Sequence, residues 1–251
     1  MTSTFSAPKD FSLELRDIIF AYPSRPMLLD KISLRMDTNS RIGLIGSNGT
    51  GKTTLARIAL GLETPTQGQV FFMGAPVSAH TNAADFSKVR ERVGYLFQNP
   101  DDQLFCPTVL EDVAFGPLNQ GLSPENARIT ASRTLTALGL DGFEGRVTHK
   151  LSGGEKKLVA LASIMSMLPS ALILDEPTND LDPETRTRLI RILGEWPGSL
   201  LVISHDWDFL TQVTNTVMAL ENGKLRQEDG EFFHQHRHIH PHGDVPHTHE
   251  G

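Results

Sequence analysis

The sequence predicts an α/β protein with a parallel central sheet covered by helices. A glycine-rich loop at residues 46–53 lies between the apolar run 42–45 and a segment of helix-forming composition at 53–60. Two further apolar runs, 171–174 and 200–203, are typical of parallel strands buried on both faces, and each ends in polar residues. Because ligands bind beyond the carboxyl ends of such strands, we expect one site there.

The N-terminal part carries strand signals before the glycine-rich loop. Residues 11–19 and 31–36 are short segments with strand patterns, and we expect them to form sheet. The helix that follows the loop is expected to stop at Gly61, which would serve as its C-cap.

Residues 85–150 are expected to form a helical insertion. Ser123 and Pro124 are typical of an N-cap followed by proline at the first helical position. The apolar positions that then recur at helical spacing, up to Gly139, are Ala127, Ala131, Leu135 and Leu138.

The C-terminal part begins with a second helix, from Ser152, and Pro169 is expected to end it. The residues that indicate this helix by their spacing are Leu158, Leu161, Met165 and Leu168. Residues 217–225 suggest a closing hairpin, and the last 18 residues are rich in histidine.

Composition excludes several classes of function. The chain has 251 residues, 39% of them hydrophobic, and a net charge of −7, which gives no global attraction for nucleic acid or anionic lipid, so we expect no nucleic-acid partner. The single cysteine, Cys106, cannot form an intramolecular disulfide, which favours a reducing cytoplasm. We expect no signal peptide, because the first eight residues lack its basic and apolar regions. We expect no transmembrane segment, because polar residues and Pro169 interrupt the most apolar stretch, 158–174.

The loop Gly46-Ser47-Asn48-Gly49-Thr50-Gly51-Lys52-Thr53 matches the phosphate-binding pattern G-x-x-x-x-G-K-[ST]. Its glycines allow backbone N–H groups to converge on phosphate oxygens, and the following helix presents its positive end to them. Lys52 would neutralise β/γ-phosphate charge, and the Thr53 hydroxyl would bind Mg²⁺. The alternative is a flexible glycine turn before a helix.

Asp175 and Glu176 follow a predicted buried strand. Asp175 is placed to hold the Mg²⁺ shell, and Glu176 is our candidate general base for the attacking water. The alternative is a solvated acidic pair that caps the next turn.

A third motif, Leu151-Ser152-Gly153-Gly154-Glu155, contains a capping box in which Ser152 and Glu155 open a helix. Its two glycines expose backbone N–H groups, so this helix end suits a phosphate. The alternative is a helix cap and nothing more.

Together these motifs resemble the ATP-binding subunits of ATP-binding cassette (ABC) transporters over residues 11–226. The resemblance implies a P-loop NTPase ABC cassette with a parallel core sheet, an N-terminal antiparallel β subdomain and a helical insertion. We therefore divide the chain into a nucleotide-binding domain, 11–232, and a histidine-rich tail, 233–251. Two departures from the family are Glu155, where glutamine is commoner, and Leu158, where arginine is usual.

The resemblance also implies roles for single residues. Glu176, His205 and Gln98 are expected to be catalytic, with His205 holding the γ-phosphate and Gln98 sensing Mg²⁺ and water. Thr53, Gln98 and Asp175 are expected at Mg²⁺. The residues expected to bind nucleotide are Tyr22, Gly46, Ser47, Asn48, Gly49, Thr50, Gly51, Lys52, Thr53, Thr54, Ser152, Gly153, Gly154 and Asp182.

The resemblance carries further implications for some of these residues. Tyr22 would stack on adenine, and a core tyrosine is the alternative. Ser152 and Gly154 would contact the ATP of the opposite subunit, which implies a head-to-tail dimer, with a homodimer as our expectation. The loop 179–182 would communicate between the two sites.

Residues 97–105 and 107–117 are similar to the ATPases of energy-coupling-factor importers. In that family the segment borders a groove for the coupling helices of a membrane protein. The implied partners are a transmembrane coupling protein and a substrate-binding membrane component, and the implied location is peripheral, at the cytoplasmic face of the membrane. Such importers take up vitamins or cobalt and nickel ions.

The C-terminal tail favours the metal alternative. In an extended segment its alternating imidazoles would lie roughly 7 Å apart on one face and suit Ni²⁺ or Co²⁺. The candidate ligands are His234, His236, His238, His240, His242, His247 and His249. The alternative for the tail is a solubilising segment without a metal role. The alternatives for the whole chain are a vitamin importer, an ABC ATPase that acts on ribosomes or DNA, and a metal-storage protein.

Overall fold

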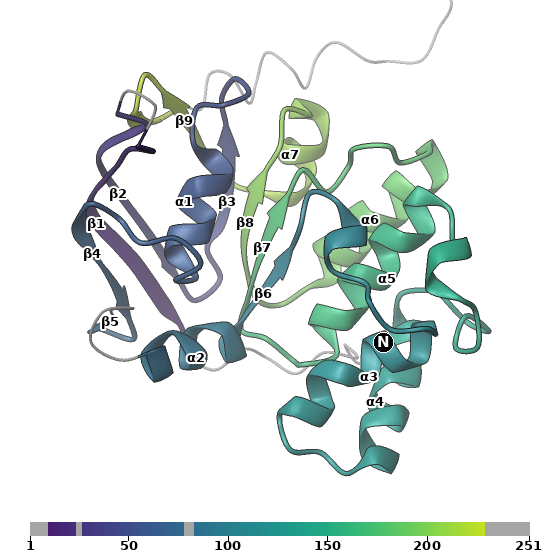
Figure 1. Cartoon of the computed structure of the whole chain (residues 1–251). Coiled ribbons are helices and arrows are strands. Elements are labelled where there is room, and N and C mark those ends of the chain that lie inside the picture. Colours follow the sequence, from purple (N-terminus) through teal and green to yellow (C-terminus); the bar gives the residue numbers. More distant parts are fainter. Residues whose placement is uncertain (1–9, 24–26, 78–82, 229–251) are drawn as a thin grey trace, which may run out of the picture.

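The computed structural model describes residues 10–23, 27–77 and 83–228, in which two sheets are flanked by helices (Figure 1). The first sheet is antiparallel, with strand order β2-β1-β4-β5. Its strands are β1 (Ser12–Phe20), β2 (Leu29–Asp37), β4 (Gln67–Phe72) and β5 (Ala75–Val77). This arrangement confirms the expected N-terminal antiparallel subdomain.

The second sheet has the order β10-β9-β3-β8-β7-β6. It is parallel except for the edge strand β10, which pairs antiparallel with β9. Its strands are β3 (Arg41–Ile45), β6 (Val93–Leu96), β7 (Ala171–Asp175), β8 (Ser199–Ile203), β9 (Thr216–Glu221) and β10 (Lys224–Gln227). Every residue of β7 and β8 is buried, as their continuous apolar sequences predicted.

Helices cover both faces of the parallel sheet. Figure 1 shows α1 between the two sheets, where its apolar side packs with both, and α5 and α6 on the other face. The helices are α1 (Lys52–Ala59), α2 (Ala83–Arg92), α3 (Val109–Asn119), α4 (Pro124–Ala137), α5 (Gly153–Met165), α6 (Pro183–Glu195) and α7 (Trp207–Val213). Two short 3₁₀ turns, Pro100–Asp102 and Thr148–Lys150, flank the lobe that α3 and α4 form.

The expectation of a helical insertion over 85–150 was wrong in its first part. Val93–Leu96 form the edge strand β6 of the parallel sheet, because this short run pairs with β7 and is buried throughout. Gly94 permits this packing, since a Cβ there would lie 2.8 Å from the Leu172 side chain and 3.1 Å from Ile164 Cβ. The helical lobe therefore begins after β6.

The second predicted helix ends earlier than its apolar spacing suggested. Helix α5 stops at Met165, and Leu168 is exposed with a φ of 52°. Leu168 precedes Pro169, and the residue before a proline is disfavoured in the helical region. In the described part of the chain, no helix combines the length and apolar character that crossing a bilayer requires.

Candidate active site

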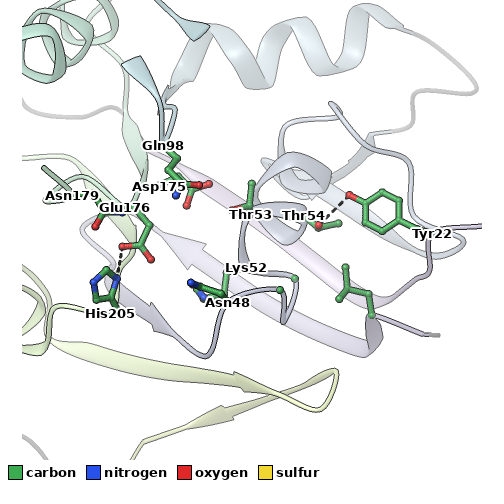
Figure 2. Close-up of a pocket in the computed structure, with 13 residues that line it drawn as sticks. Tyr22, Asn48, Lys52, Thr53, Thr54, Gln98, Asp175, Glu176, Asn179 and His205 are labelled. Carbon is green, nitrogen blue, oxygen red and sulfur yellow. Dashed lines mark hydrogen bonds and ion pairs between the residues drawn. The ribbon is translucent and has the colours of Figure 1, made fainter. Parts of the chain in front are cut away.

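A pocket of about 360 Å³ opens at the carboxyl ends of β7 and β8, beside the N-terminus of α1 (Figure 2). It brings together residues from the glycine-rich loop, the acidic pair and the end of β8, which are far apart in the sequence. The lining residues are Tyr22, Leu28, Asn48, Gly49, Gly51, Lys52, Thr53, Thr54, Gln98, Asp175, Glu176, Asn179 and His205.

The glycine-rich loop provides the floor of this pocket. Gly46 has a φ of 146°, and a Cβ on it would lie 2.4 Å from the backbone oxygen of Leu220, so only glycine fits there without strain. Helix α1 begins after Gly51 with no side-chain cap, which leaves its first N–H groups for an anion.

Lys52 lies folded over this loop. Its ammonium donates hydrogen bonds to the carbonyls of Gly46, at 2.6 Å, and Ser47, at 3.0 Å. Burial lowers the pKa of Lys52, and the nearby carboxylates of Glu176 and Asp175 oppose that effect. The Lys52 ammonium has therefore lost part of its hydration, and the oxygens of a bound polyphosphate can replace the lost water.

The Asp175 carboxylate is buried, and only one of its oxygens has a protein partner. Oδ2 accepts a hydrogen bond of 3.2 Å from the Tyr95 hydroxyl, whose pKa is raised by burial and by the Asp175 charge, so the phenol remains a donor. Oδ1 is buried and has no hydrogen-bond partner within the described ranges. With Thr53 and Gln98 lining the same pocket, this free oxygen fits a hydrated Mg²⁺.

Glu176 and His205 form the charged wall of the pocket. His205 Nδ1 lies 3.0 Å from Glu176 Oε2, as the dashed line in Figure 2 marks. The Glu176 side chain is 8% exposed and that of His205 is 70% exposed, so His205 faces solvent while it holds a buried carboxylate. Glu176 has a φ of 47°, and its amide donates to the Ile203 carbonyl at 2.8 Å.

Tyr22 lies at the mouth of the pocket. It is half-buried, its hydroxyl is 3.3 Å from the Thr54 hydroxyl, and its ring packs edge-on against Phe20 with centroids 4.9 Å apart. The ring therefore lies on the pocket wall, where it can contact a base, and it also packs against the core cluster that contains Phe20.

Several predicted site residues do not line this pocket. Gly46, Ser47 and Thr50 belong to the glycine-rich loop but are not among the residues that line the pocket. Ser152 and Gly153 are exposed at the tip of α5, where the Ser152 hydroxyl accepts from the Glu155 amide at 3.3 Å.

Asp182 also lies outside the pocket. It caps α6 and accepts a hydrogen bond of 2.6 Å from the Thr185 hydroxyl. A Cβ on Gly154 would lie 3.5 Å from Asp182 Oδ2, so the α5 tip and Asp182 form one separate surface.

Sequence reasoning missed two buried residues that support the site. Tyr95 was missed because strand β6 was not predicted. Lys157 was missed because it falls among apolar positions of α5; its ammonium donates to the Gln98 carbonyl at 2.5 Å. The available signal was a lysine beside the apolar positions of a predicted helix, which indicates a buried charge that needs partners.

An apolar groove of about 600 Å³ runs along the lobe that the predicted coupling segment helps to form. The exposed rings of Phe105 and Phe115 line it and pack edge-to-face, with centroids 4.8 Å apart. Its other apolar walls include Leu60, Leu62, Phe97 and Met167.

The histidines proposed as metal ligands in the tail, His234 to His249, lie outside the described residues. Within residues 10–23, 27–77 and 83–228, there is no group of three or more histidine, cysteine or acidic residues that could hold a metal.

Comparison with known proteins gives one consistent family. A family profile described as "ABC transporter" matches residues 29–179. The Energy-coupling factor transporter ATP-binding protein EcfA of Methanothermobacter thermautotrophicus is 42% identical over 86% of this chain and 70% of its own length. The Nickel import ATP-binding protein NikO of Rhodobacter capsulatus is 40% identical over 85% of this chain and 87% of its own length.

The solved structures include a similar chain. The structure of cbiO1 from Clostridium perfringens, described as part of the ABC transporter complex cbiONQ, superposes with a TM-score of 0.80 at 30% identity. The match covers 91% of this chain and 92% of that one.

Proposed function

Because the chain belongs to the ABC transporter family, as an ATPase of the energy-coupling-factor type, we propose that it energises the import of cobalt or nickel ions. The observation that carries the ATPase part is the pocket in which Lys52, Asp175, Glu176 and His205 meet above the start of α1.

In this proposal the glycine-rich loop and Lys52 hold the β- and γ-phosphates of ATP. Backbone N–H groups at the start of α1 point at the phosphates, and the Lys52 ammonium exchanges its loop carbonyls for phosphate oxygens. Thr53, Asp175 and Gln98 would hold Mg²⁺, which when bound neutralises phosphate charge and polarises the transferred group. Tyr22 contacts the adenine from the pocket mouth.

Glu176 orients the attacking water and accepts its proton. Its carboxylate is buried at the γ-phosphate end of the pocket, and the hydrogen bond from His205 fixes the side chain's orientation. His205 also contacts the γ-phosphate, since its ring is exposed on the pocket side.

A second copy of the chain completes the site. Ser152 and Gly154 lie at the α5 tip, outside their own pocket, and the positive N-terminal end of this helix suits a γ-phosphate that a second copy holds. We therefore propose a head-to-tail homodimer that closes when ATP binds and reopens after hydrolysis.

Replacing Glu176 with glutamine tests the ATPase proposal. The Glu176→Gln protein should bind ATP with unchanged affinity and lose nearly all turnover, because an amide cannot accept the proton. Glu125→Gln, an exposed change at the start of α4, is the matched control. Unchanged hydrolysis by Glu176→Gln would remove the general-base assignment.

The groove around Phe105 and Phe115 supports docking of a transmembrane coupling protein, which would place the chain peripherally at the cytoplasmic face of the membrane. The partner complex would also contain a substrate-binding membrane component. Co-purification of these membrane proteins with the full chain, and its loss in a Phe105→Asp variant, would support this assignment; retention of the complex in that variant would contradict it.

The similarity to a nickel import ATPase and the histidine-rich tail support the metal substrate. Uptake assays with the co-purified complex should show Ni²⁺ or Co²⁺ transport, and transport of a vitamin instead would contradict the proposal. Calorimetry with and without residues 234–251 tests the tail separately: equal Ni²⁺ and Co²⁺ affinity would remove its metal role.

A further inference from the structure

A lysine on α5, Lys157, is buried outside the nucleotide pocket. It lies five positions after Ser152 and is 3% exposed. Its ammonium donates to the carbonyl of Gln98 at 2.5 Å and reaches the carbonyl of Glu176 at 3.5 Å. One side chain of α5 thus contacts the peptides of both residues that face the attacking water.

Both partners of Lys157 are main-chain carbonyls rather than carboxylates. A buried ammonium loses its hydration and is tolerated only where hydrogen bonds replace the lost water. An apolar side chain of similar volume would fill the same space without that cost, so packing does not explain a lysine here.

The Glu176 peptide requires more support than an ordinary one. Its φ of 47° lies in the left-handed region, which is unfavourable for a residue with a side chain and persists only where the surroundings fix it. The amide is fixed by the Ile203 carbonyl, and the Glu176 carbonyl faces Lys157. Gln98 follows β6 in a loop, and its carbonyl is held by the same ammonium.

The N-terminal end of α5, which carries Lys157, is also fixed. Ser152 and Glu155 form a complete capping box, in which the Glu155 carboxylate accepts from the Ser152 amide at 2.8 Å. The Ser152 tip and the Lys157 side chain are therefore carried by the same rigid first turns of one helix.

We propose that Lys157 is a positioning residue that holds Gln98 and Glu176 in their active arrangement and links them, through α5, to the Ser152 tip. This inference rests on the proposed function, since it assumes that the Ser152 tip contacts ATP held by a second copy. When that contact forms, the tip and Lys157 move together. Contact with the ATP of the second copy therefore adjusts Gln98 and Glu176, which face the ATP in the chain's own pocket.

The test is steady-state ATPase kinetics and ATP binding on the full chain. In Lys157→Met, which keeps the packing but removes the donor, kcat should fall about tenfold while the Kd for ATP stays within about twofold. The parent should hydrolyse ATP with a Hill coefficient above 1, and Lys157→Met should bring it close to 1. Lys157→Gln, which keeps a shorter donor, should lie between the two.

The neighbouring lysine provides a matched control. Lys156 pairs with Asp101 at 2.6 Å, but the Asp101 side chain is 62% exposed, and pairs of this kind contribute little. Lys156→Met should retain the parental kcat and Hill coefficient within about twofold.

The inference is overturned if Lys157→Met melts at the parental temperature and retains the parental kcat, or if the parent has a Hill coefficient of 1. If Lys157→Met does not fold, the same criteria apply to Lys157→Gln. Turnover that persists in Glu176→Gln would instead count against the proposed function. Parental kinetics in Lys157→Met beside an inactive Glu176→Gln would count against this inference alone.

Discussion

Replacement of His205 by alanine should slow ATP hydrolysis about tenfold without weakening ATP binding to the same degree. His205 Nδ1 contacts Glu176 Oε2 at 3.0 Å, and the Glu176 side chain is 8% exposed. The alanine variant leaves this buried carboxylate without the partner that orients it toward the attacking water.

The magnitude follows from the exposure of the two groups. A hydrogen bond to a charged group contributes about 1.5–3 kcal/mol, which corresponds to roughly a 10- to 100-fold change in rate if all of it acts in the transition state. Because the His205 side chain is 70% exposed, water can replace part of the lost interaction, which favours the lower end of this range.

Phosphate release at saturating MgATP measures kcat, and a fluorescent nucleotide measures Kd. His149→Ala, a change at an exposed histidine on the helical lobe, is the matched control and should keep both values. A His205→Ala protein that keeps the parental kcat, whether or not its Kd for ATP changes, would refute a role for His205 in orienting Glu176.

Three further predictions concern residues around the pocket. Gly46→Ala forces a Cβ to within 2.4 Å of a backbone oxygen at a φ of 146°, so its melting temperature and ATP affinity should both fall in calorimetry. Tyr22→Ala should weaken ATP binding roughly 5- to 100-fold if the ring stacks on adenine, and Tyr22→Phe should not. Burial raises the pKa of Asp206, but the hydrogen bond from Arg186, the hydrogen bond from the Phe209 amide and the Arg186 charge together outweigh it and leave the pKa lowered. A lowered folded-state pKa gives stability that is present above about pH 4 and lost as pH falls further, so Arg186→Met should cost about 1 kcal/mol at pH 7 and the difference should vanish in acid unfolding curves.

The central part of the fold could be predicted because its signals are local. The strand, glycine-rich loop and helix at 42–60 depend on a contiguous pattern, and the buried strands β7 and β8 depend on short, continuous apolar runs that end in polar residues. The acidic pair and His205 follow those strands directly, so their meeting at one sheet edge followed from the parallel arrangement.

Other parts depend on tertiary contacts that no local pattern encodes. Strand β6 has four residues, and it is a strand because β7 and α5 bury it, with Gly94 allowing the close approach. Tyr95, which occupies one oxygen of Asp175, could not be assigned to the site without that strand. The contact of Lys157 with Gln98, 59 positions earlier in the chain, likewise cannot be predicted from a local sequence pattern.

The exposure of His205 gives a physical reason for the second copy that we propose. The pocket of one chain places a buried carboxylate beside a ring that is 70% exposed, so water reaches the end where the γ-phosphate would lie. Electrostatic stabilisation of a transferring phosphate is strongest where water is excluded and donors are fixed in advance. The exposed Ser152 at the N-terminus of α5 is held by its capping box and lies outside its own pocket, so this helix end would supply such donors to a second copy. Covering His205 with that tip would exclude water and add donors in one step, which explains why hydrolysis would wait for dimer closure.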